Sequence, residues 1–287
     1  MKLRAFRLPI LFSCALWACS QPHEAAPASE VVVQASSGAL PADPDDAQWA
    51  RAGEFSTPLI LQDMVEPRLL APSTLAVRVR ALSDGARIAF RLEWQDAPRD
   101  DVQLPAQFTD ACAVQLPSKT APDVPAPQMG EPGRPVEITY WRASWQAVVD
   151  GRPDTIQALH PNAVPSTYPY DAASLEPGSE DQLEMQRRYA PARSLGNHMA
   201  GPRQKPVEDL VAEGPGTLAP GSGIDGNASG KRTADGWVVV ISRRLPAGFT
   251  PGQRTQVAFA VWEGAHEEVG ARKMRSGWTP MLLEVKP

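Results

Sequence analysis

The sequence contains very little cysteine: only Cys14, Cys19 and Cys112 among its 287 residues. The first two lie in the N-terminal segment, so a single thiol remains for the rest of the chain. One thiol forms neither an internal disulfide nor a zinc or iron–sulfur site, and the absence of a CxxCH motif excludes a covalently attached haem. We therefore expect Cys112 to be a small, buried apolar residue.

Long hydrophobic runs are also missing, except at the N-terminus. There, three basic residues precede an apolar run of about ten residues, too short to span a bilayer, and we predict that residues 1–18 form a signal peptide. The stretch Leu16-Trp-Ala-Cys19 resembles the lipobox of bacterial lipoproteins, in which the cysteine is acylated. We expect a periplasmic protein anchored to a bacterial membrane through Cys19. The alternative is plain cleavage that leaves a soluble periplasmic product.

An excess of basic charge is lacking as well. The formal charge is −5 at pH 7, and it becomes −8 without residues 1–18, because this leader holds three basic residues and no acidic one. An acidic protein repels nucleic acid and anionic lipid. We therefore expect no nucleic-acid partner, contact with a membrane only through the lipid anchor, and docking partners with basic surfaces.

Proline, by contrast, is abundant, with 30 residues beside 21 glycines. This content disfavours long helices and favours strands joined by ordered loops. Residues 19–42 are rich in Ala, Pro, Ser and Gly, so we predict a lipid-anchored flexible tether there. One folded domain is then expected from residue 43 to residue 287.

Alternating hydrophobic and polar residues predict the strands of this domain. The pattern is clearest in residues 75–81 and 87–94, which the turn signal Asp84-Gly85 joins into a hairpin with one buried face. Shorter patterns predict strands at 108–116, 136–145, 237–245, 256–262 and 281–285. A short helix is expected at 181–189 in the otherwise irregular region 151–235, a candidate partner surface. The fold class is all-β: an antiparallel β-sandwich with long irregular loops and little helix.

Signals for hydrolysis and for a metal site built on histidine are absent. The chain has no Gly-x-Ser-x-Gly elbow, and its four histidines are not paired at metal-ligand spacing. His198 lies in the irregular region, and His266 precedes Lys273 by seven residues. We expect each histidine to be solvated or hydrogen-bonded. The sequence leaves open whether His198 or His266 contacts a cofactor.

Two separate blocks of the sequence resemble one known family. The first block holds Gln128-Met129-Gly130 and the strand residues up to Trp141, and the second holds Trp262, Arg272-Lys273 and Trp278. Both are similar to blocks of the haem b-binding γ subunit of ethylbenzene dehydrogenase and its relatives. These relatives include dimethylsulfide dehydrogenase and the selenate and chlorate reductases, which are type II members of the dimethyl sulfoxide reductase family. The resemblance extends over most of residues 45–285.

This resemblance implies a non-covalently bound haem b with Met129 and Lys273 as the axial ligands of its iron. Ligation requires the neutral amine, and burial lowers the pKa of a lysine. Trp141, Trp262 and Trp278 are expected as apolar walls of the haem pocket. With both axial positions filled, the haem transfers electrons and this chain catalyses no reaction.

The resemblance also implies partners. These are a molybdopterin catalytic subunit, an iron–sulfur subunit, and a c-type cytochrome as the electron partner. Thioether ligation raises the reduction potential of a haem, which suits exchange with such cytochromes. The substrate of the complex and the direction of electron flow do not follow from the sequence.

Other functions remain open from the sequence alone. One is a solute- or glycan-binding periplasmic lipoprotein on a β-sandwich without haem, which exposed aromatic platforms would support; the chain has 8 tryptophans. Another is a stand-alone haem sensor or cytochrome that uses His198 or His266. Met274, next to Lys273, is a further candidate ligand.

Overall fold

A computed structural model describes residues 29–153, 158, 160–162, 175–195, 197 and 203–285. The predicted signal peptide, Cys19 and His198 lie outside these residues. Within the described ranges, none of the helices has the length and apolar character needed to cross a membrane.

The predicted all-β fold class is confirmed. The strands are β1 (Val31–Ala35), β2 (Phe55–Pro58), β3 (Ile60–Leu61), β4 (Ala76–Ser83), β5 (Arg87–Gln95), β6 (Ala111–Pro117), β7 (Val136–Arg142), β8 (Val207–Ala212), β9 (Ala219–Pro220), β10 (Asn227–Arg232), β11 (Gly236–Arg244), β12 (Arg254–Trp262), β13 (Met274–Arg275) and β14 (Thr279–Leu283). The α-helices are short: α1 (Ala143–Val149), α3 (Glu180–Tyr189) and α4 (Pro191–Ser194). Two 3₁₀ turns, η1 (Ala47–Arg51) and η2 (Gly264–His266), complete the regular structure of the described part.

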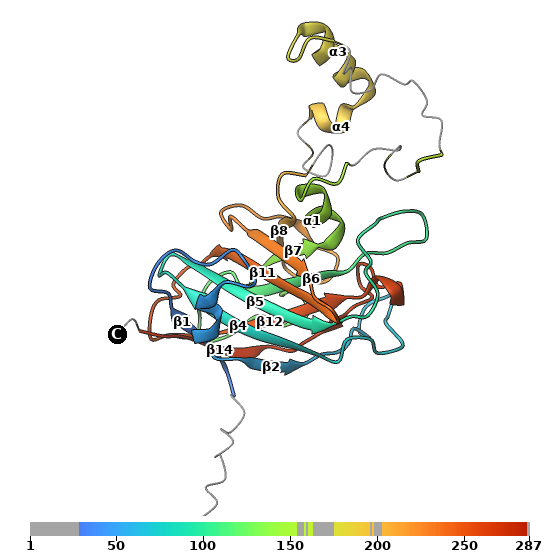
Figure 1. Cartoon of the computed structure of the whole chain (residues 1–287). Coiled ribbons are helices and arrows are strands. Elements are labelled where there is room, and N and C mark those ends of the chain that lie inside the picture. The colour runs from blue at the N-terminus through green and yellow to red at the C-terminus, as the bar shows by residue number, and fades with distance from the viewer. Residues whose placement is uncertain are drawn as a thin grey trace, which may run out of the picture.

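The strands form one continuous sheet that turns back on itself into two layers (Figure 1). Its main path runs β10-β11-β5-β4-β1-β14-β12-β6-β7-β8-β9, with β2 beside β4, β13 beside β12, and β3 beside β13. Strand β12 belongs to both layers, because residues 254–257 pair with β14 and residues 258–262 pair with β6. The layer β12-β6-β7-β8 carries the site described below.

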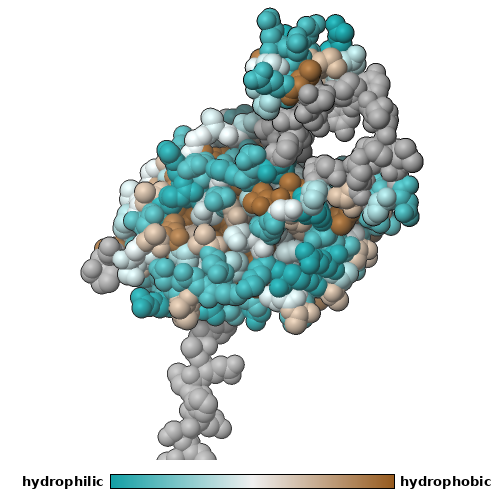
Figure 2. Space-filling model, turned by 45° about the horizontal axis from the view of Figure 1, so that its top comes forward, coloured by the Kyte–Doolittle hydropathy of each residue, from teal (hydrophilic) through white to brown (hydrophobic). Residues whose placement is uncertain are grey.

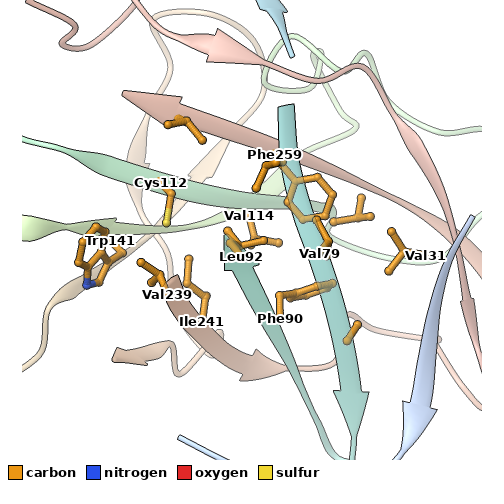
Figure 3. Packing of buried hydrophobic residues seen from close by; sticks show 14 of the residues in the cluster. Val31, Val79, Phe90, Leu92, Cys112, Val114, Trp141, Val239, Ile241 and Phe259 are labelled. Carbon is orange, nitrogen blue, oxygen red and sulfur yellow. The ribbon is translucent and has the colours of Figure 1, made fainter. Parts of the chain in front are cut away.

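Apolar side chains from the two layers meet in one core (Figure 3). Phe90 on β5 contacts Phe259 on β12 edge to face, with ring centroids 6.1 Å apart. Cys112 on β6 is a free, fully buried thiol in this core, which confirms the prediction made for it. Removing this apolar surface from water stabilises the sandwich by about 25 cal/mol per Å².

Strand β1 corrects the predicted domain boundary. Residues 19–42 were expected to form a flexible tether, but Val31 and Val33 lie in the core. Strand β1 pairs in parallel with β4 on one side and with β14 on the other. The three consecutive valines 31–33 therefore form a buried strand, and its two parallel pairings make the sandwich locally mixed rather than purely antiparallel.

The remaining strand predictions hold with two local exceptions. The hairpin of β4 and β5, and the strands β6, β11, β12 and β14, lie where alternation placed them, and α3 lies at the predicted helix. The strand predicted at 136–145 ends at residue 142, because α1 begins there and packs Trp145 against Tyr140. The region 151–235 is less irregular than predicted: β8 pairs with β7, and β10 pairs with β11.

The face of the molecule in Figure 2 is mainly hydrophilic, with hydrophobic residues in small groups. None of the large hydrophobic side chains that the structure describes as exposed is a tryptophan. Exposed tryptophan platforms, which would favour a glycan-binding function, are therefore absent from the described residues, although Tyr189 on α3 is an exposed aromatic side chain. Helices α3 and α4 stand apart from the two sheet layers in Figure 1.

Candidate functional site

A cavity of about 410 Å³ lies against the outer face of the layer β12-β6-β7-β8. Alternation along each strand separates this face from the core. On β6, Ala113 lines the cavity while Cys112 and Val114 belong to the core. On β12, Ala258 and Ala260 line it. These alanines leave open space above the strands, and the volume is within the usual range for a small-molecule site.

Met129 reaches the cavity from the loop between β6 and β7. Side chains from the floor and the rim hold this loop: Gln115 Nε2 donates to the Pro127 carbonyl at 3.0 Å, and Trp278 Nε1 donates to the Pro125 carbonyl at 2.6 Å. The backbone N–H of Gly214, just after β8, donates to the Met129 carbonyl at 2.8 Å.

The backbone at Met129-Gly130 is left-handed, with φ of 67° and 80°. Glycine is needed at the second position for two reasons. It adopts this conformation without strain, and an added β-carbon would stand 2.8 Å from the Ala212 carbonyl oxygen and 3.0 Å from that of Arg134. The tight turn aims the preceding methionine at the cavity.

Lys273 reaches the same cavity from the segment between η2 and β13. Gln62 fixes this segment by donating its backbone N–H to the Lys273 carbonyl at 3.0 Å and its side-chain amide to the Ala271 carbonyl at 3.1 Å. Trp262 Nε1 donates to the Gly270 carbonyl at 3.1 Å. Two buried side chains therefore set the backbone from which the lysine extends.

The methionine and the lysine enter at opposite ends of the floor. The turn at Met129-Gly130 lies beside Val136 and Ala212, where β7 begins and β8 ends. Lys273 precedes Met274, which lies in one cross-strand row with Val261, Cys112 and Trp141, near the end of β7. The methionine turn therefore lies at the level of residue 136 of β7, and the lysine lies near the level of residue 141. These five residues correspond to roughly 17 Å along the strand.

The environment of Lys273 makes its amine easier to deprotonate than the amine of an exposed lysine. Burial lowers the pKa of Lys273 to about 8, and the positive charge of Arg275 adds to this effect. The Lys273 Nζ atom lies 5.1 Å from the ring centroid of Trp262. Among the described residues, no carboxylate is within ion-pair distance of this nitrogen. The lysine is therefore set apart from the exposed, paired lysines of the surface.

The three predicted tryptophan walls have different places. Trp262 lines the cavity beside Lys273, so its role as a wall of a haem pocket stays a prediction. Trp278 packs against the apolar cluster that contains Trp262, and its indole N–H holds the loop of Met129. It does not line the cavity. The prediction for Trp141 is wrong, because this side chain is fully buried on the core side of β7.

Trp141 is held in the core by its neighbours. Its ring contacts Trp94 and Trp237 edge to face, with centroids 6.4 and 5.2 Å apart, and its Nε1 donates to Gln146 Oε1 at 3.0 Å. Alternation gives the wall position on β7 to Tyr140 instead, a residue that is not among the predicted walls.

Tyr140 is the centre of the aromatic group on the floor. Its ring contacts Trp262 and Trp145 edge to face, with centroids 5.0 and 5.5 Å apart. Burial raises the pKa of Tyr140 to about 12, so the phenol stays neutral. The signal that could have identified it is the two-residue period of β7, in which Val136, Ile138 and Tyr140 share one face.

The other candidate ligands lie away from the cavity. Met274 is a core residue on the opposite side of its strand from Lys273. The His266 side chain is 46% exposed, and its Nε2 lies 3.7 Å from Glu263 Oε1. His160 is exposed.

Comparison with known proteins gives a consistent set of relatives. The model of the family described as ethylbenzene dehydrogenase matches residues 46–274. A putative respiratory nitrate reductase heme subunit of Haloferax mediterranei is 26% identical over 265 residues, which are 88% of this chain and 73% of that protein. The chlorate reductase subunit gamma of Ideonella dechloratans is 24% identical, with 88% of this chain and 84% of that protein covered.

The dimethylsulfide dehydrogenase subunit gamma of Rhodovulum sulfidophilum is 27% identical over 169 residues, 55% of this chain and 61% of that protein. Among solved structures, a family 9 carbohydrate-binding module from Caldicellulosiruptor kristjanssonii in complex with cellotriose is similar at 10% identity and a TM-score of 0.44. This likeness covers 90% of this chain and 94% of that one.

Proposed function

The chain belongs to the ethylbenzene dehydrogenase family, and on this premise we propose that it is the haem-binding electron-transfer subunit of a molybdenum oxidoreductase complex. Its relatives are named as a heme subunit of a nitrate reductase and as gamma subunits of dimethylsulfide dehydrogenase and chlorate reductase. In this role the chain carries electrons, and the catalytic reaction belongs to another subunit.

One observation carries the proposal: Met129 and Lys273, 144 residues apart in sequence, line the same apolar cavity from its two ends. The donor set fits a haem. A thioether and a neutral amine both offer a lone pair to iron, and the alanine floor leaves room for a flat apolar macrocycle. The cavity requires no cysteine, in keeping with the missing CxxCH motif.

The side chains around the cavity explain electron transfer without catalysis. In this proposal Met129 and Lys273 would both hold the iron of the haem, which would then carry electrons and bind no substrate. The apolar side chains of Trp262 and Ile138 and the ring of Tyr140 line the cavity around Lys273, and this burial disfavours the charged form of its amine. A haem b bound there supplies a one-electron carrier, and the methionine raises its reduction potential.

The finer assignments extend the same proposal. The haem is haem b, held without a covalent bond. The partners are a molybdopterin catalytic subunit, an iron–sulfur subunit and a c-type cytochrome. The protein acts in the periplasm, anchored through Cys19. The acidic charge of the mature chain supports docking to a basic partner surface.

Optical spectra of the purified protein, expressed with ample haem, test the ligand pair. Oxidised and dithionite-reduced samples should show the sharp bands of a low-spin b-type haem. Met129→Ala and Lys273→Ala should each abolish the low-spin spectrum, because each leaves the iron with one axial ligand. Met64→Ala and Lys119→Ala are matched controls, since both side chains are exposed outside the cavity, and both should keep it.

Other outcomes would contradict the proposal in distinct ways. A colourless protein would exclude haem binding and leave the solute-binding function. A low-spin spectrum that survives both ligand substitutions but disappears in His198→Ala would reassign the ligands.

A further inference from the structure

Arg275 is a second cation that faces the cavity. It lies two residues after Lys273, and both side chains line the cavity, while Met274 between them points into the core. This is the expected alternation of an extended strand. Arg275 pairs with Ala260 of β12 on one side and with Ile60 of β3 on the other. The arginine therefore rises from the edge of the alanine floor.

The guanidinium of Arg275 retains unused hydrogen-bonding capacity. Its Nε atom is buried and has no hydrogen-bond partner in the described part of the chain. An arginine remains protonated in proteins and presents a planar fork of donors that matches a carboxylate. A buried donor without a partner is costly, so this position is suited to an acidic group of a ligand.

The charges on the cavity walls are also arranged unequally. Arg275 stands on β13 beside β12, whereas the acidic residue lining the cavity, Glu208, stands on β8 at the opposite edge of the floor. A ligand with carboxylates on one edge is attracted toward Arg275 on β13. The cavity thereby distinguishes the two edges of an asymmetric ligand.

We propose that Arg275 binds a carboxylate of the cavity's ligand, and that it selects the orientation in which the acidic edge of the ligand faces β13. This inference rests on the proposed function, under which the carboxylate is a propionate of haem. Lys273 and Arg275 then have separate tasks: the lysine amine binds the iron, and the arginine binds the propionate.

Titration of the full-length apoprotein with haemin and with haemin dimethyl ester tests this assignment. The ester lacks both carboxylates but keeps the iron and the macrocycle. The wild-type protein should bind haemin about tenfold more tightly than the ester, as expected for one charge-assisted hydrogen-bonded pair. Arg275→Gln should bind both porphyrins equally, and Arg275→Lys should retain part of the preference.

Two further variants locate the effect. Arg272→Gln is the matched control, because this neighbouring arginine lies over Phe108 outside the cavity, and it should keep the full preference. Lys273→Ala should lose the low-spin spectrum but keep the preference for haemin. Circular dichroism of each apoprotein checks that it is folded. If Arg275→Gln does not fold, Arg275→Lys and Lys273→Ala still decide the assignment.

Equal binding of both porphyrins by the wild type, with a low-spin spectrum, would overturn the role of Arg275 and leave the proposed function intact. A preference that disappears with Lys273 rather than with Arg275 would reverse the two assignments. Failure to bind either porphyrin would overturn the proposed function, and this inference with it.

Discussion

Asp96 is a buried carboxyl next to another, Asp110, at the end of β5. Burial, together with the negative charges of Asp110 and Glu263, raises the pKa of Asp96 from its ordinary value of 3.8 to about 8. Between these two values the folded chain holds a proton that the unfolded chain releases. The free energy of unfolding should therefore decrease as the pH rises from about 4 to about 8.

Replacing Asp96 with Asn tests this linkage. The amide keeps the shape of the neutral acid and does not titrate, so Asp96→Asn should vary less in stability across this pH range and should be more stable than the wild type above pH 8. Urea denaturation at several pH values measures the effect. Asp63→Asn, at an exposed position, should follow the wild-type profile. An Asp96→Asn profile as steep as the wild-type one would refute the assignment.

Gly130 shapes the turn that carries Met129. Gly130→Ala should destabilise the protein by about 1–3 kcal/mol through its positive φ, and the contact with the Ala212 carbonyl should displace the loop and weaken haem binding. Gly133→Ala is the control, because its φ of 76° is similar but no atom lies within 4 Å of the added β-carbon. Denaturant titration of both variants measures the cost of backbone strain, and haem titration measures the effect of displacing the loop. Equal haem affinities of the two variants would contradict this role of Gly130.

At the scale of elements, β6 presents two chemically different faces. Ala113→Leu should fill part of the cavity and weaken haem binding at least tenfold. The stability of the apoprotein should change by no more than about 0.5 kcal/mol, because the new side chain enters open space. Val114→Ala on the other face should do the reverse, costing about 2 kcal/mol in the core while haem affinity is retained. Haem titration and chemical denaturation of the two variants give the comparison; weaker binding in both would refute the separation of faces.

Alternation explains which elements the sequence could predict. Strands β4, β5 and β12 combine a hydrophobic inner face with a distinct outer face, so their pattern is visible locally. Strand β1 escaped because three successive valines carry no alternation, and β10 because its six residues, Asn227–Arg232, include only one apolar side chain. Pairing with neighbours far away in sequence decides the structure of both.

The candidate site was predictable only in part. Met129 and Lys273 came from the family resemblance, and no local pattern distinguishes them. The error at Trp141 arose because Tyr140 and Trp141 are adjacent aromatics, and only the strand period tells which one faces the cavity. The open space above Ala113 and Ala260 depends on loops from distant parts of the chain, so no single segment of the sequence contains it.

At the scale of the whole molecule, β1 defines where the folded domain begins. A chain that starts at Ser29 should retain the stability and haem affinity of the full-length protein, because β1 remains. A chain that starts at Asp43 lacks β1 and exposes the edges of β4 and β14, so it should lose several kcal/mol of stability or fail to fold. Thermal denaturation of the two truncated proteins decides the matter; equal melting temperatures would restore the boundary at residue 43.

The parallel pairing of β1 with β14 places the first strand of the domain beside the last. A chain that emerges from a ribosome or a translocation channel N-terminus first therefore cannot close its sandwich until the final strand has appeared. Lys273 also emerges only shortly before that moment. Under the proposed function, haem uptake therefore requires the polypeptide up to β14.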